Sequence, residues 1–98
     1  MPQTLTPSLS ALYTEKFPTS AKLFERGRHV FPNGVTHDGR YLTPFPVYID
    51  HAQGSKKYDP DGSEIIDYWM GHGSLLLGHS HPAVVDAVQR QAARATHP

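Results

Sequence analysis

Cysteine is absent from the 98 residues of this chain, which excludes disulfide bonds, thiolate zinc sites and a cysteine nucleophile. An excess of either charge is absent too, since nine Lys and Arg balance nine Asp and Glu. A neutral chain has no electrostatic attraction to nucleic acid or to an anionic membrane, so we expect neither partner. Apolar runs near the ~20 residues that cross a bilayer are missing, and residues 1–17 lack the parts of a secretory signal. We therefore expect a cytoplasmic protein.

Proline and glycine are plentiful instead. Nine prolines and eight glycines indicate many turns and short elements. The hydrophobic fraction of 38% comes near the ~45–50% of globular domains once glycine is counted, so the composition is not that of a disordered tail. The length fits one small domain at most.

Residues 1–30 are predicted to form an N-terminal helical segment. Four apolar residues of the stretch 8–17 share one helical face: Leu9, Leu12, Tyr13 and Phe17. Pro18 is predicted to end this helix, because the residue before a proline disfavours the α conformation. Ser20 is a candidate N-cap for a second helix that reaches about Arg28.

Residues 31–98 are predicted to contain a strand cluster, a glycine-rich loop and a helix. Val47–Ile49, Lys56–Tyr58 and Glu64–Tyr68 are the candidate strands. Ala52–Ser55 is a predicted turn, and Asp59–Gly62 is a second one, because its proline fixes φ and its glycine tolerates a positive φ. The pattern predicts a three-stranded antiparallel meander.

The last predicted helix begins at Pro82, which suits a first helical turn, and Ser80 or His81 can cap it. Its members at helical spacing are Val84, Val88, Gln91, Ala92 and Ala95.

The run from Gly71 to Pro82 is the most unusual part of the chain. Gly73 to Ser80 spells G-x-x-x-x-G-H-S, which lacks the lysine of a phosphate-binding P-loop, so nucleotide binding is not expected. His72, His79 and His81 lie close together in this run, and His37, His51 and Asp67 are within reach of them in principle. Their spacing does not place them on one helical face, which favours capping and hydrogen-bonding roles over a metal site.

Arg40 is the one basic residue of the long loop from Gly34 to Pro46. Its residue type leaves two interpretations open. A lone arginine in a loop is usually solvated, whereas the planar guanidinium also suits a carboxylate held by two hydrogen bonds.

The order of the motifs is more specific than any one of them. Three blocks follow one another: F-P-N-G-V-T-H-D-G-R from Phe31 to Arg40, Y-D-P-D-G-S-E-I-I-D-Y from Tyr58 to Tyr68, and G-S-L-L-L-G-H-S-H-P from Gly73 to Pro82. This series resembles the N-terminal part of the class-III pyridoxal-phosphate (PLP) aminotransferases, in the glutamate-1-semialdehyde 2,1-aminomutase branch. The resemblance extends from about Ser20 to Thr96.

The resemblance implies a fold-type-I α/β enzyme, usually a homodimer, of which this chain is an α+β piece. It places Arg40 where aminomutase-like members bind the substrate carboxylate. It places His72 where many members have a tryptophan beside cofactor and substrate, and makes Gly71, Gly73 and Ser74 parts of an active-site loop. This chain departs from the aminomutase pattern at two positions, with His72 in place of the tryptophan and His37 in place of a smaller polar residue. A transaminase that acts on another amino or β-amino acid therefore remains an alternative to the aminomutase.

The family's Schiff-base lysine, pyridinium-binding aspartate and phosphate-binding turn have no match within the 98 residues. The large cofactor domain is therefore absent from this chain, and we expect no catalysis and no specific PLP binding by it alone. The amino-acid or amine substrate would be bound by the complete enzyme. The alternative is a truncated, non-catalytic relative that acts as an interaction or dimerisation module.

Overall fold

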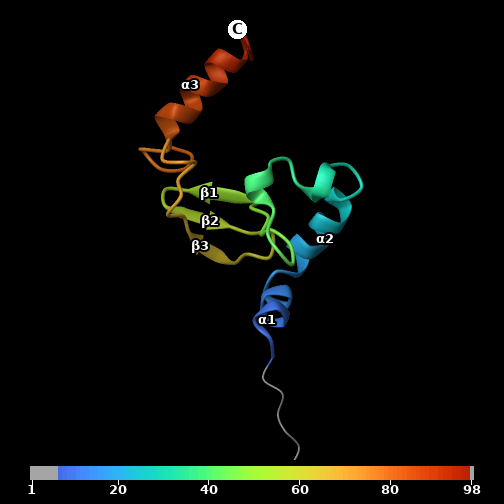
Figure 1. Cartoon of the computed structure of the whole chain (residues 1–98). Helices are drawn as coiled ribbons and strands as arrows, with labels where there is room; N and C mark the ends of the chain where they lie inside the picture. Colours follow the sequence, from blue (N-terminus) through green and yellow to red (C-terminus); the bar gives the residue numbers. More distant parts are fainter. Residues whose placement is uncertain (1–6, 98) are drawn as a thin grey trace, which may run out of the picture.

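The computed structural model describes residues 7–97, which form three α-helices, two 3₁₀ turns and one antiparallel sheet (Figure 1). In chain order the elements are α1 (Leu9–Lys16), α2 (Pro18–Gly27), η1 (Pro32–Gly34), η2 (Asp38–Arg40), β1 (His51–Gln53), β2 (Lys56–Tyr58), β3 (Glu64–Ile66) and α3 (Pro82–Ala92). The predicted combination of N-terminal helices, three-stranded meander and C-terminal helix is confirmed.

The sheet is a meander in the order β1-β2-β3. Gln53 lies opposite Lys56 across a two-residue turn, and Lys56 lies opposite Ile66 on the other side. Gly54 occupies that turn at φ 58°, a left-handed conformation in which glycine has no steric penalty.

The predicted first strand, Val47–Ile49, is wrong: β1 begins four residues later, at His51, and runs into the first half of the predicted turn 52–55. The stretch before β1 packs on α2 instead, because the Tyr48 backbone N–H donates to the Ser20 hydroxyl at 2.9 Å. A β-branched, aromatic stretch therefore supplies packing surface rather than ladder hydrogen bonds.

The buried apolar residues lie where α1 and α2 meet the segment before β1. Phe17 and Phe45 are buried, and the Tyr13 ring lies between them, with centroid distances of 5.1 Å and 4.9 Å. The Tyr13 hydroxyl donates to the Phe45 carbonyl at 2.6 Å, so this aromatic cluster also carries a long-range hydrogen bond. Leu9 and Leu12 of the predicted apolar face are exposed.

The predicted N-cap of α2 is wrong. Pro18 begins α2 rather than only ending α1, and Ser20 is a fully buried residue within the first turn of α2. The cap comes from the β2–β3 turn, where the Asp61 carboxylate accepts from the Thr19 backbone N–H at 3.0 Å and from the Thr19 hydroxyl. The meander is thereby joined to the helical segment by a charged cap.

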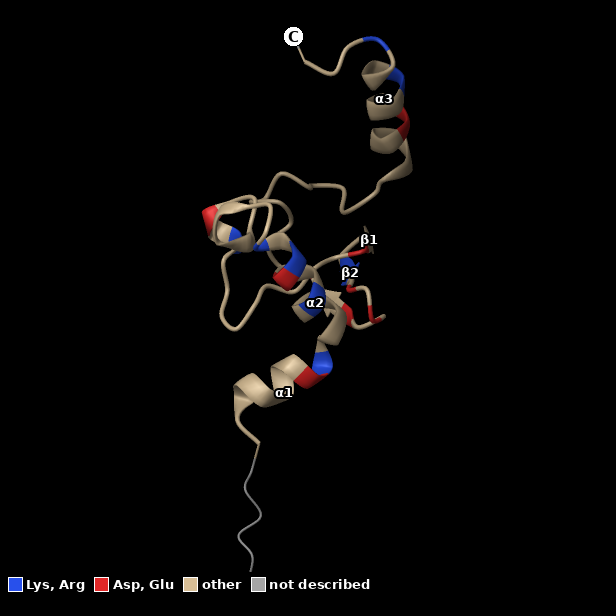
Figure 2. Cartoon of the chain, turned by 90° about the vertical axis from the view of Figure 1, so that its right-hand side faces the viewer, with Lys and Arg blue, Asp and Glu red and all other residues tan. Residues whose placement is uncertain are grey.

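α3 projects away from the sheet, and all of its residues are exposed (Figure 1). The His81 imidazole accepts from the Ala83 N–H at 3.2 Å, which confirms the predicted cap. The radius of gyration is 17.5 Å, against about 13 Å for a compact domain of this length. Acidic and basic residues are interspersed along the helices, with no helix of one charge sign in this view (Figure 2).

Candidate functional site

A broad hollow of about 1010 Å³ lies between the loop that follows α2, the sheet and the glycine-rich loop. Its apolar wall is formed by residues from all three parts: Phe31, Val35, Leu42, Pro46, Val47, Ile49, Ile65 and Trp69. The basic and imidazole side chains of the lining are His37, Arg40, Lys57 and His72, and the lining described contains no Asp or Glu. An apolar hollow with positive groups and no acid suits an anionic organic ligand.

Arg40 ends the η2 turn at the rim of this hollow. Its backbone N–H donates to the His37 carbonyl at 3.0 Å, and its Nη1 donates to Thr36 Oγ1 at 2.6 Å. Within residues 7–97, no carboxylate lies within ion-pair distance of the guanidinium. The Arg40 charge is thus available to an incoming anion.

His37 precedes Arg40 on the same turn. Its Nδ1 accepts from the Gly39 backbone N–H at 3.0 Å. In the neutral imidazole the proton then resides on Nε2, which makes His37 a donor at its outer nitrogen. A Cβ at Gly39 would lie only 3.2 Å from His37 Nδ1, so the absence of a side chain at Gly39 leaves room for the imidazole ring.

Four consecutive residues, Met70 to Gly73, have φ between 50° and 81°. The Gly73 N–H donates to the Trp69 carbonyl at 3.0 Å, which closes one left-handed turn. Such a turn costs about 1–2 kcal/mol at each non-glycine residue, here Met70 and His72. The turn places the His72 ring edge-on to the Trp69 ring, with centroids 4.9 Å apart.

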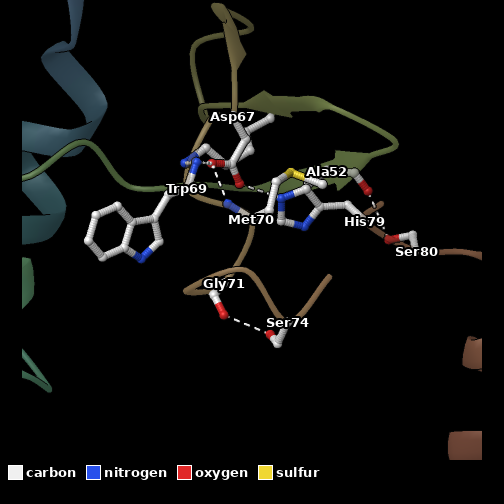
Figure 3. A network of polar contacts seen from close by, with 9 residues as sticks. Ala52, Asp67, Trp69, Met70, Gly71, Ser74, His79 and Ser80 are labelled. Carbon is white, nitrogen blue, oxygen red and sulfur yellow. Dashed lines mark hydrogen bonds and ion pairs between the residues drawn. The ribbon is translucent and has the colours of Figure 1, made fainter. Parts of the chain in front are cut away.

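Asp67, directly after β3, anchors this strained loop (Figure 3). Its buried carboxylate accepts from the backbone N–H groups of Trp69 at 2.8 Å and Met70 at 3.1 Å. Its second oxygen lies 2.6 Å from His79 Nε2, and Lys57 Nζ lies 3.6 Å from its first oxygen. Chiefly the His79 hydrogen bond, with those from Met70 and Trp69, holds the pKa of Asp67 well below its usual range.

The far end of the loop is tied to the β1–β2 turn. Gly54 and His79 exchange two backbone hydrogen bonds of 3.0 Å and 2.9 Å. The Ser80 hydroxyl donates to the Ala52 carbonyl at 2.8 Å (Figure 3). The loop 69–80 is therefore fixed at both ends.

Three of the five predicted site residues, Arg40, Gly71 and His72, line the same hollow. Gly73 and Ser74 are not among its lining residues. The Ser74 hydroxyl donates to the Gly71 carbonyl at 2.7 Å, so it stabilises the loop from within (Figure 3). The substrate-binding roles of these residues stay predictions.

Sequence reasoning gave no role to Thr36, and it gave Asp67 and His79 only as distant members of a histidine group. Thr36 could have been identified as a partner of Arg40 from the sequence, because it lies four residues before this arginine in a predicted loop. Asp67 and His79 do meet, as a hydrogen-bonded pair. The described residues contain no group of three or more acidic, His or Cys side chains placed to hold a metal ion.

The hollow does not by itself have the groups that hold PLP. Lys57 is its only lysine among the residues described, and its ammonium lies beside the Asp67 carboxylate. The described lining offers no acid for a pyridinium nitrogen either. This segment can supply one wall of a cofactor site.

Comparison with known proteins gives consistent results. The family Aminotransferase class-III matches residues 38–98. Glutamate-1-semialdehyde 2,1-aminomutase of Methanopyrus kandleri is 42% identical over 87% of this chain and 20% of its own length. The structure of the Pseudomonas aeruginosa aminomutase in complex with PMP has a TM-score of 0.76 and 31% identity, over 84% of this chain and 18% of that one. The structure of a β-phenylalanine aminotransferase from Variovorax paradoxus has a TM-score of 0.79 and 26% identity, over 88% of this chain and 20% of that one.

The chain thus spans about a fifth of the length of the curated relatives it matches. Within residues 7–97, no helix has the length and apolar character needed to cross a bilayer. The folded segment corresponds to part of the fold-type-I transaminases. With a family match over more than half of its residues and a relative 42% identical over most of them, this chain belongs to the class-III aminotransferases.

Proposed function

We propose that the complete polypeptide containing this segment is a PLP-dependent transaminase or aminomutase that acts on a carboxylated amino compound. The observation that carries the proposal is the Arg40 guanidinium at the rim of a hollow whose described lining contains no acid. The related aminomutase in complex with PMP supports the cofactor class. PLP, when bound, supplies the electron sink for amine chemistry.

In this proposal Arg40 binds the substrate carboxylate through its planar fork. His72, with Trp69 edge-on behind it, forms a wall of the substrate site, and Gly71, Gly73 and Ser74 shape the loop that carries this wall. The remaining polypeptide supplies the lysine and the groups that hold the cofactor.

The proposed organisation follows the family. In this proposal residues 1–30, of which 1–6 lie outside the described residues, belong to an N-terminal helical segment, and residues 31–98 belong to the small-domain meander, loop and helix beside a large cofactor domain. The complete protein is proposed to be a cytoplasmic homodimer.

The test uses the complete polypeptide and two substitutions, Arg40→Lys and Arg40→Ala. A charged hydrogen bond contributes about 1.5–3 kcal/mol, so we expect kcat/KM for carboxylated amine donors to fall about ten- to a hundredfold, and further in Arg40→Ala. Donors without a carboxylate should change little. Arg26→Lys, on an exposed position of α2 outside the hollow, is the matched control. Equal losses for both donor classes would reject the carboxylate site.

A non-catalytic interaction or dimerisation module is the second candidate, favoured by the exposed apolar residues Leu76, Leu77, Val84 and Val88. The coding sequence after Pro98 separates the two candidates. A continuing frame with a later Schiff-base lysine supports the enzyme, and a stop codon supports the module.

A further inference from the structure

Thr36 and Arg40 face each other across the η2 turn and both line the hollow. The Arg40 Nη1 donates to Thr36 Oγ1 at 2.6 Å. Among the described residues, Thr36 is the hydrogen-bond partner of the Arg40 guanidinium. The other hydrogen bond that Arg40 donates comes from its backbone N–H and does not involve the guanidinium. The direction in which the fork points is therefore set by a hydroxyl.

A hydroxyl differs from a carboxylate in this position. A carboxylate would orient the guanidinium but neutralise it and compete with an incoming anion. The threonine oxygen takes one of five N–H donors and leaves the charge and the other four donors available. A carboxylate partner would therefore weaken the binding of an anion by Arg40, whereas the threonine hydroxyl leaves Arg40 able to bind one.

We propose that Thr36 is a positioning residue that fixes the Arg40 guanidinium and thereby sets which amino acids the enzyme prefers by the distance between their carboxylate and their amine. This inference rests on the proposed function. A fixed guanidinium binds a carboxylate well at one position only. Each added methylene between the carboxylate and the amine of the substrate then moves the amine away from its reactive position. A mobile fork can follow the carboxylate, at an entropic cost, and discriminates less.

The test compares Thr36→Val, which keeps the shape and removes the hydroxyl, with Thr36→Ser, which keeps the hydroxyl. The donors are α-, β- and γ-amino acids with one common side chain, and the corresponding amines without a carboxylate. For Thr36→Val we expect kcat/KM of the preferred amino acid to fall about tenfold, as for the loss of one hydrogen bond to a charged group, while the other chain lengths fall less. The preference among chain lengths should flatten, and the amines should be unaffected.

Thr36→Ser should restore the preference of the unsubstituted enzyme. Thr43→Val, in the same loop but outside the lining of the hollow, is the matched control and should leave the preference unchanged. Far-UV circular dichroism accompanies each variant, and Thr36→Ala repeats the test if the valine variant does not fold.

A loss that is equal for all donors would show that Thr36 has only a structural role and would overturn the inference. An unchanged chain-length preference in Thr36→Val would overturn it as well, while the proposed function would stand if Arg40→Lys still separated the donor classes. An unsubstituted enzyme that turns over none of these donors, neither the amino acids nor the amines, would overturn both the inference and the proposed function.

Discussion

His79 Nε2 lies 2.6 Å from Asp67 Oδ2, and this contact joins the end of β3 to the segment that precedes α3. The other Asp67 oxygen binds two backbone N–H groups at the start of the strained turn 70–73. One buried carboxylate therefore holds both ends of the loop that carries His72. The position of the His72 wall depends on this carboxylate rather than on the intrinsic preference of the loop.

Replacing Asp67 with Asn should release the loop. The Asn oxygen is neutral and accepts more weakly, so we expect the amides of Trp69 and Met70 to exchange hydrogen about ten- to a hundredfold faster, equivalent to about 1.5–3 kcal/mol. Hydrogen exchange read by NMR or mass spectrometry of the complete polypeptide measures this. Asp86→Asn, in an exposed ion pair on α3, is the control. Unchanged protection at Trp69 and Met70 would contradict the anchoring role.

The same carboxylate predicts a pH dependence. The pKa of Asp67 is lowered in the folded protein, first by the His79 hydrogen bond, so its stabilising effect is complete above the ordinary Asp pKa of about 3.9. That effect is lost as the pH falls from about 4 toward the lowered folded pKa. Loop protection in the unsubstituted protein should therefore decline below about pH 4, and in Asp67→Asn this part of the decline should be missing.

Local motifs predicted much of this fold, and long-range contacts decided the rest. The turn at Asp59–Gly62 could be predicted locally, because its proline fixes φ and its glycine tolerates a positive φ. Val47–Ile49 failed as a strand, since the Tyr48 N–H finds the Ser20 hydroxyl 28 residues away. The cap of α2 failed for the same reason, because Asp61 provides it from another element. Arg40 and His72 came from the family resemblance, whereas Thr36 required the geometry of the turn.

Gly78→Ala should destabilise the loop attachment more than Gly62→Ala does. Both glycines have nearly the same φ, 84° and 85°, so the cost of the left-handed conformation, about 1–2 kcal/mol, is shared. A Cβ at Gly78 would lie 3.0 Å from Gly54 Cα, whereas nothing lies within 4 Å of one at Gly62. We expect a lower melting temperature for Gly78→Ala than for Gly62→Ala, and faster hydrogen exchange of the His79 amide in Gly78→Ala only. Both differences measure the added clash. Equal effects would show that Gly54 moves aside.

The isolated 98-residue chain should be marginally stable and should self-associate. Phe17 and Phe45 are the large apolar side chains buried in the described part, whereas Leu76 is 90% and Val88 is 60% exposed. Exposed apolar side chains of this kind promote association. Light scattering on a size-exclusion column should show oligomers, and denaturant unfolding should be broad. A monomer with a sharp, cooperative transition would contradict this prediction.

PLP added to the isolated chain should modify several lysines slowly and without selectivity. The Glu64 hydrogen bond raises the pKa of Lys56, which favours its protonated, non-nucleophilic form, and the Lys57 ammonium lies 3.6 Å from an Asp67 carboxylate oxygen. Lys16 and Lys22 are exposed on the helical segment, outside the hollow. Reduction with borohydride followed by peptide mass spectrometry should find the label spread over these lysines and removed by a competing amine added before reduction. A Lys57→Arg variant should leave the total label nearly unchanged. Stoichiometric label on one lysine that resists a competing amine would show that this segment holds the cofactor without the large domain.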